Sequence, residues 1–226
     1  MAASVFLQGR AEIGWRQRII IGVGMDPKYR ITAGLIGGLG VLALLAQVAL
    51  NLDQRGWGLG QTLWGLAGFF TILTNALMAA TMLTIAATGR RLSFGWMTMV
   101  TMSMIAVGVV YHLLLAHLFH FTGLNWWTDQ AFHTILPAFM LWFWLMETTR
   151  HNPRGGQPLW WLIWPAGYAV YAMMRGAVTG WYPYPFLDIG QLGLGAVAVN
   201  MAGLVAGFAV LGFGLNAIGQ RLPLRD

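Results

Sequence analysis

The chain has 226 residues, of which 58% are hydrophobic and 9% are charged, with no cysteine and a net charge of +6. Because soluble domains carry about 25% charged residues, this composition excludes a water-soluble globular protein and predicts an integral membrane protein. The absence of cysteine excludes disulfides, thiol nucleophiles and iron–sulfur clusters.

Six apolar stretches of about 20 residues are long enough to form transmembrane helices. In chain order they cover residues 31–51, 65–87, 94–118, 130–149, 159–178 and 191–217. They make up one transmembrane domain over residues 31–219, between a basic N-terminal segment at 1–30 and a short tail at 220–226. The predicted fold class is therefore an all-α integral membrane protein with six spans.

Basic residues are concentrated on one side of these spans, which the positive-inside rule makes the cytoplasmic side. Both termini are then predicted to be cytoplasmic. Topology and anionic lipid explain the basic charge, so no nucleic-acid partner is expected. Eleven of the 13 Lys and Arg residues lie on this side: Arg10, Arg16, Arg18, Lys28, Arg30, Arg90, Arg91, Arg150, Arg154, Arg221 and Arg225.

The polar side chains within the spans gather towards the outer surface of the membrane. Polar groups inside a membrane are costly, so they are functional candidates. The candidates are Thr71, Thr74 and Asn75 in the second span, His112 in the third, Asp129 and His133 at the start of the fourth, and Arg175, Tyr184 and Asp188 at the end of the fifth span and in the loop after it.

Each candidate also has a structural interpretation. A membrane threonine such as Thr71 commonly bonds to the carbonyl one turn earlier, and an asparagine such as Asn75 can bond to a neighbouring helix. His133 precedes a proline by one turn and can serve a helix kink. Arg175 can pair with Asp188 and hold the last outer loop.

Several kinds of chemistry can be compared with the sequence. His112, His117 and His133, with Asp129 or Asp188, could supply metal ligands, but no His-Glu-x-x-His spacing is present, and no metal is expected. A haem electron carrier would use His112 and His133 from facing helices. A small-molecule or lipid carrier would use the polar cluster as its binding site and would need access from both sides.

A hydroxyl nucleophile with a histidine base remains. Thr71 and His133 occupy different spans at similar depths, and histidine is a suitable base for a hydroxyl proton at neutral pH. Asp129, one turn before His133, could orient the imidazole, and Asn75 could donate to a developing oxyanion. Thr134 is a rival nucleophile, although it points about 100° away from His133 around the helix.

Four motifs occur in order along the chain: "FFTILTN" (69–75), "FHTILPAFML" (132–141), "MRG" (174–176) and "GWYPYPFLDIG" (180–190). Together they resemble the androgen-induced-protein family, which includes the androgen-dependent TFPI-regulating protein and many bacterial relatives. The resemblance extends over the second to the sixth span.

This resemblance implies a multipass membrane hydrolase with Thr71 as nucleophile and His133 as base. It implies substrates such as fatty acid esters of hydroxy fatty acids, or other lipid esters. We therefore expect an ester hydrolase without a cofactor at the outer face of a bacterial-type inner membrane. Arg175 is expected to bind a substrate carboxylate.

Overall fold

A computed structural model describes residues 27–148 and 160–222, which form helices and loops without a strand. Its helices are α2 Pro27–Arg55, α3 Leu59–Leu66, α4 Phe70–Thr88, α5 Phe94–Val110, α6 Gly123–Gln130, α7 Leu136–Glu147, α9 Ile163–Thr179 and α10 Ile189–Arg221. Short turns connect some of them: the π-helical η1 Tyr111–Leu115 and η3 Ala131–Ile135, and the 3₁₀ turns η2 Ala116–Leu118 and η4 Pro185–Leu187.

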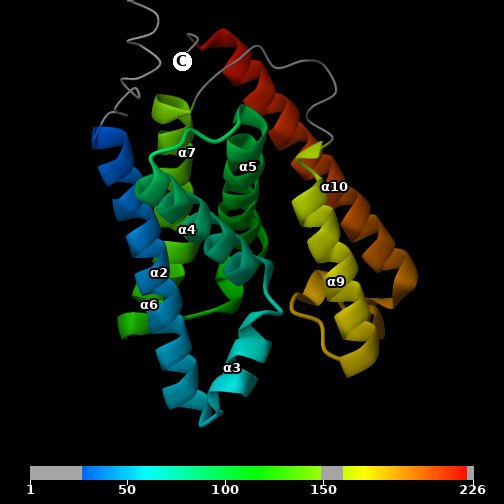
Figure 1. Ribbon diagram of the computed structural model, residues 1–226. Helices are drawn as coiled ribbons and strands as arrows, with labels where there is room; N and C mark the ends of the chain where they lie inside the picture. Colours follow the sequence, from blue (N-terminus) through cyan, green and yellow to red (C-terminus); the bar gives the residue numbers. More distant parts are fainter. Residues whose placement is uncertain (1–26, 149–159, 223–226) are drawn as a thin grey trace, which may run out of the picture.

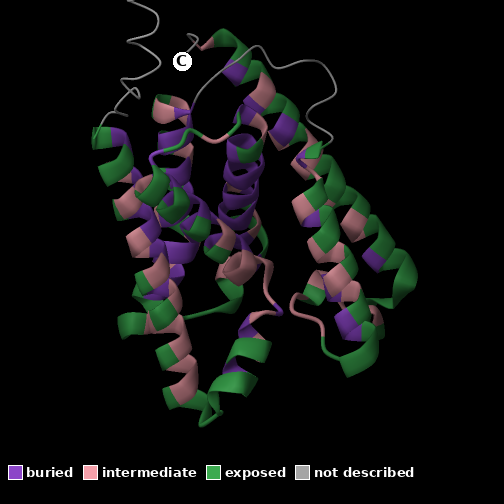
Figure 2. Ribbon diagram, in the orientation of Figure 1, coloured by how far each residue is buried: buried purple, intermediate pink, exposed green. Residues whose placement is uncertain are grey.

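Helix α5 occupies the centre of the bundle, where it contacts α4, α7 and α10 (Figure 1). Helix α2 packs along α4 on one side, and α9 and α10 form the opposite side. Colouring by burial shows the same order, since most of α5 is buried and the outward faces of α2, α9 and α10 are exposed (Figure 2). The first residues of α2 and the last residues of α10 lie at the same end of the bundle.

The described helices include four that are long and apolar enough to cross a membrane. Their outward faces are apolar as well: Leu35 on α2 is 70% exposed and Val199 on α10 is 72% exposed. Such surfaces are unfavourable in water and favourable in lipid. The predicted all-helical fold is therefore confirmed, and four of its helices are candidate membrane spans. The four helical segments are Pro27–Arg55, Phe70–Thr88, Phe94–Leu118 and Ile189–Arg221.

The other two predicted spans are helical but less typical of a membrane crossing. The predicted span 130–149 corresponds to η3, which contains His133, followed directly by α7. Residues 159–178 correspond to α9, which has 17 residues. Most of the predicted segments 1–30 and 220–226 lies outside the described residues.

The predicted span 65–87 is not continuous, because a break at residues 67–69 separates α3 from α4. The break exposes backbone carbonyls, and apolar surroundings require partners for them. Helix α9 supplies these partners, since the Tyr168 hydroxyl donates to the Gly68 carbonyl at 2.8 Å and the Tyr171 hydroxyl donates to the Ala67 carbonyl at 3.1 Å. As a result, Thr71 lies in the first turn of α4 instead of in mid-helix.

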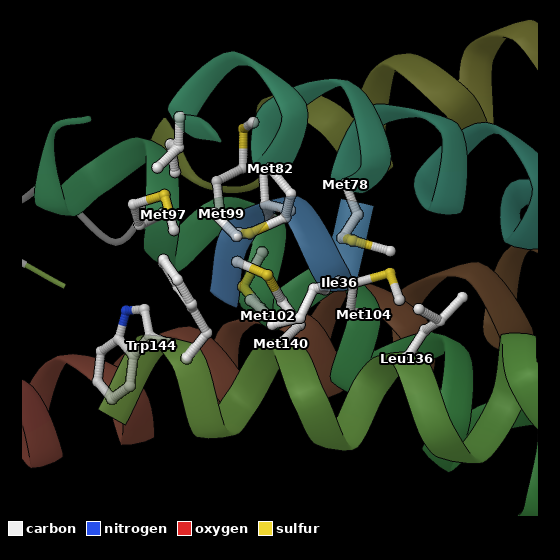
Figure 3. Packing of buried hydrophobic residues seen from close by; sticks show 14 of the residues in the cluster. Ile36, Met78, Met82, Met97, Met99, Met102, Met104, Leu136, Met140 and Trp144 are labelled. Carbon is white, nitrogen blue, oxygen red and sulfur yellow. The ribbon is translucent and has the colours of Figure 1, made fainter. Parts of the chain in front are cut away.

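The core between α2, α4, α5 and α7 is rich in methionine, as Figure 3 shows. Unbranched methionine side chains fill irregular gaps between helices. The buried hydroxyls of α5 are satisfied within the helix, because Thr98, Thr101 and Ser103 each donate to the carbonyl four residues earlier. Such hydroxyls have a structural role, which sets them apart from Thr71.

Candidate functional site

Two π-helical turns position the site. In η3 the Leu136 N–H donates to the Ala131 carbonyl, five residues earlier, and η1 has the same pattern. Pro137 has no N–H to offer the His133 carbonyl, which instead faces Gly108 of α5. A Cβ atom at Gly108 would lie 2.8 Å from that oxygen, so α5 approaches η3 closely only because this residue is glycine.

Thr71, His133 and Asp129 form one chain of contacts. The Thr71 Oγ1 atom lies 3.4 Å from His133 Nε2. On the other side of the ring, His133 Nδ1 lies 3.0 Å from Asp129 Oδ1 and 3.0 Å from the Asp129 carbonyl oxygen. Both of these oxygens are acceptors, so Nδ1 carries the proton and Nε2 presents its lone pair to Thr71.

The Asp129 carboxylate is itself held in place. It is 7% exposed, and its Oδ2 accepts from the Tyr111 hydroxyl at 2.8 Å and from the Gln130 amide at 3.4 Å. The Tyr111 ring stacks on the His133 ring with centroids 3.7 Å apart and an interplanar angle of 11°. Tyr111 therefore fixes both the carboxylate and the imidazole plane.

Tyr184 lies at the N-terminus of α4, beside Thr71. Its hydroxyl accepts from the Thr71 backbone N–H at 3.5 Å and also faces the Phe70 N–H and the hydroxyls of Thr71 and Tyr168. The first N–H groups of a helix have no intrahelical partner and carry the positive end of its dipole. Burial raises the pKa of the Tyr184 phenol, which therefore stays protonated and able to donate.

An apolar cavity of about 190 Å³ opens beside Thr71. Its wall comes from α5 and η1, α9, the loop through η4, and α10. Apart from Thr71, the hydroxyls on this wall belong to Tyr111, Tyr168 and Tyr184. His133 is not a wall residue, so Thr71 stands between the imidazole and the cavity.

Asn75 and Thr74 support α4. The Asn75 side-chain N–H donates to the Thr71 carbonyl at 2.9 Å, and its buried Oδ1 has no hydrogen-bond partner among the described residues. In this arrangement one of the two N–H groups of the expected oxyanion donor is already engaged, and the unpaired oxygen of the amide is an acceptor. Thr74 accepts from the Trp164 indole at 3.0 Å and so joins α4 to α9.

His112 belongs to a separate, exposed group. Its Nε2 lies 3.0 Å from Thr134 Oγ1, and the Thr134 hydroxyl donates to the Gln130 side-chain oxygen at 3.0 Å. Since Thr134 gives its only proton to Gln130, the His112 Nε2 must be the donor in their contact. His112 therefore presents no lone pair to Thr134 and cannot activate it as a nucleophile.

Arg175 and Asp188 do not pair with each other. The guanidinium of Arg175 donates to the Trp64 carbonyl at 2.7 Å and to the Tyr171 hydroxyl at 3.0 Å. Asp188 caps α10 by accepting from the Gln191 N–H at 3.1 Å. The loop is therefore held by a helix cap, and the interpretation as an Arg175–Asp188 ion pair is wrong.

The described residues contain no cluster of three His, Cys, Asp or Glu side chains suited to a metal ion. The two histidines considered for haem have their Nε2 atoms directed at different hydroxyls, His112 at Thr134 and His133 at Thr71. The stacked Tyr111 ring also covers one face of His133. This geometry does not favour a facing pair of haem ligands.

Two residues of the site received no role from the sequence, although Tyr111 belongs to the polar residues at the outer end of the third predicted span. Tyr111 directly precedes His112 and lies at the depth of His133, which is a signal that could have identified it. Gly108 gives no such signal, because its importance depends on the carbonyl freed by a proline on another helix. Comparisons with protein-family models, curated proteins and solved structures find no match, so the function is argued from this site.

Proposed function

We propose that the protein is a membrane-embedded hydrolase of lipid or fatty-acid esters, with Thr71 as nucleophile and His133 as general base. The observation that carries the proposal is the chain from Thr71 through His133 to Asp129 at the wall of an apolar cavity. A hydroxyl, a base and a group that orients the base are the three parts that this type of catalysis requires.

The reaction follows from these contacts. His133 Nε2 takes the proton of Thr71 Oγ1 while that oxygen bonds to the ester carbonyl carbon. The carbonyl–alkoxy bond then breaks, and the protonated imidazole gives its proton to the departing alkoxide, which leaves as an alcohol. Water then attacks the acyl-threonine, His133 again takes the proton, and a carboxylic acid and free Thr71 result.

The oxyanion of the intermediate needs donors close to Thr71. The geometry favours the Tyr184 hydroxyl and the backbone N–H groups at the start of α4 over Asn75, whose amide nitrogen donates to the Thr71 carbonyl. These donors are fixed before the substrate arrives, which is the property that makes such a site effective. Asn75 then positions the nucleophile by holding its backbone.

The cavity supports a lipid-like acyl group. Its wall is formed by apolar side chains such as Leu162, Met201 and Phe208, with the tyrosine hydroxyls near the Thr71 end. An acyl chain would lie along the apolar part and bring its carbonyl to Thr71. Fatty acid esters of hydroxy fatty acids fit this description, as do other esters with one extended chain.

The proposal includes six membrane crossings with both termini in the cytoplasm of a bacterial-type cell, and the site in the outer half of the inner membrane. The positions of the α2 start and the α10 end at one side of the bundle support an even number of crossings (Figure 1). Because the chain has no cysteine, single cysteines introduced by Gly58→Cys and Arg90→Cys can test it. We expect an impermeant thiol reagent on intact cells to label the first and not the second.

Covalent labelling with a fluorophosphonate probe tests the reaction. The full chain would be purified in mild detergent as wild type, Thr71→Ala, His133→Ala and Thr134→Ala, with the labelled residue read by mass spectrometry. Thr134 is a matched control, because it is an adjacent threonine that also contacts a histidine. We expect wild type and Thr134→Ala to label at Thr71, and the other two variants to lose labelling.

Labelling of wild type at Thr134 would keep the reaction class and move the nucleophile. Folded wild type that takes no label and cleaves no ester would reject the proposal. Uptake of a lipid into vesicles by such an inactive protein would favour a carrier instead.

A further inference from the structure

A second cavity, of about 490 Å³, lies beside the break between α3 and α4, where Leu66 and Phe69 border it. We name it the Arg175 vestibule. It is bounded by Arg55 at the end of α2, by Gln61 and Trp64 of α3, and by Arg175 and Trp181 at and beyond the end of α9. Phe69, which precedes the first turn of α4, also borders it, so the vestibule adjoins the Thr71 site.

Arg175 is a buried cation without a balancing charge. It is only 8% exposed, and an arginine stays protonated under all ordinary conditions. Among residues 27–148 and 160–222 no carboxylate forms an ion pair with it, and no Asp or Glu borders the vestibule. An isolated buried charge is costly, and a bound anion would remove that cost.

The guanidinium also has hydrogen-bonding capacity left over. Its hydrogen bonds to Tyr171 and Trp64 use one N–H on each terminal nitrogen, whereas a guanidinium has five N–H groups. The Nε atom is buried and has no partner among the described residues. A carboxylate or a phosphate accepts two such bonds side by side, which few other groups can do.

The surroundings suit the rest of an amphiphile. Arg175 lies over the Trp64 ring at 4.2 Å and near the Trp181 ring at 5.4 Å, so the charged group is flanked by flat apolar surfaces. Arg55 adds a second positive charge at the exposed rim, where it stacks on Trp57 at 4.6 Å. Tryptophans of this kind are typical of the membrane interface, where an acidic group with an apolar tail lies.

We infer that the Arg175 vestibule binds the oxyacid group, carboxylate or phosphate, of an acidic membrane amphiphile. The site has a charge, free donors and apolar walls in one place, and the binding does not require Thr71 to be a nucleophile. Because the vestibule adjoins the α4 start, its ligand would lie next to the apolar cavity and select acidic over neutral molecules there.

Titration calorimetry on the full chain in a non-ionic detergent tests this. The probes are oleate, phosphatidylglycerol and inorganic phosphate, with oleyl alcohol and phosphatidylcholine as neutral counterparts. We expect at least one acidic lipid to bind at least tenfold more tightly than its neutral counterpart. Binding by oleate alone assigns the site to carboxylates, and binding by phosphatidylglycerol alone assigns it to phosphate headgroups.

Variants locate the binding. Arg175→Gln should weaken it at least tenfold, Arg55→Gln should weaken it less, and Arg90→Gln, which removes an exposed charge in the loop after α4, should leave it unchanged. Thr71→Ala should bind normally, which separates this inference from the proposed hydrolysis. Binding in Arg175→Gln equal to wild type would overturn the assignment.

A further measurement on wild type covers the case in which Arg175→Gln does not fold, since its bonds to Trp64 and Tyr171 also support the bundle. A rise in salt from 0.05 to about 0.5 M should weaken binding of the acidic lipid, because salt screens the rim charge of Arg55. If neither acidic lipid binds wild type more tightly than its neutral counterpart, or if free phosphate binds as tightly as phosphatidylglycerol, the inference is overturned with wild type alone.

Discussion

Replacement of Asp129 by asparagine tests the charge behind the histidine. In the proposed reaction His133 becomes positively charged while its Nδ1 lies 3.0 Å from Asp129 Oδ1. The variant keeps the size and shape of the side chain, so its Oδ1 can still accept from Nδ1. The Asp129 backbone carbonyl, also at 3.0 Å, continues to hold the proton on Nδ1.

The expected loss therefore comes mainly from the charge. Two unit charges about 4 Å apart at an effective dielectric of about 20 attract by about 4 kcal/mol. At 1.36 kcal/mol per tenfold, this corresponds to a loss of about 10³-fold in the acylation rate. A serine protease loses about 10⁴-fold on the same change because the wrong tautomer forms. The second acceptor should make the loss smaller here.

The assay is the rate of fluorophosphonate labelling at Thr71, with Glu147→Gln as a control for the loss of one carboxylate at the far end of α7. Tyr111→Phe removes the donor to Oδ2 and keeps the charge, so it should lose less than tenfold. Labelling of Asp129→Asn within threefold of wild type would refute the reasoning. A loss in Tyr111→Phe as large as in Asp129→Asn would show that orientation, and not charge, dominates.

Three further changes have defined outcomes. Gly108→Ala puts a Cβ 2.8 Å from the His133 carbonyl oxygen, and this overpacking should cost about 1–3 kcal/mol of folding free energy, so both the labelling rate and the melting temperature should fall. Gly38→Ala, with open space around it, should change neither quantity. Equal effects of the two substitutions would contradict this. Tyr184→Phe should slow ester cleavage about 10²-fold, measured by turnover of a chromogenic ester, and full activity would remove it from the oxyanion site. Ala169→Phe narrows the apolar cavity, so the preferred acyl chain should shorten in a screen of esters of graded length.

The sequence predicts the helices better than their interruptions. Hydropathy identifies the apolar stretch 65–87 but not the break at 67–69, because the carbonyls exposed there are satisfied by tyrosines about a hundred residues later. The meeting of Thr71 and His133 follows from their similar depths in the second and fourth predicted spans, which run in the same direction. The role of Asn75 does not follow, since one hydrogen bond decides which end of its amide is free.

The contacts of Arg175 and Asp188 were the least predictable. Arg175 and Asp188 have opposite charges and lie near each other in the chain, which made an ion pair plausible. Helix geometry decides otherwise, because a residue directly before α10 caps its N–H groups. Arg175 instead donates to the carbonyl of Trp64 in α3. That helix is separate from α4 only because of the break at residues 67–69, which the sequence did not predict.

The π-helical turn η3 also changes which faces of one continuous helix can be used. Each extra residue in a helix rotates everything after it by about 100° relative to an uninterrupted α-helix. The Asp129 side of α6 and the Met140 side of α7 can therefore address different neighbours, the polar site and the methionine core, without a break in the chain. Deletion of a single residue within 131–135 would remove this offset, so the two halves could no longer both face their present neighbours.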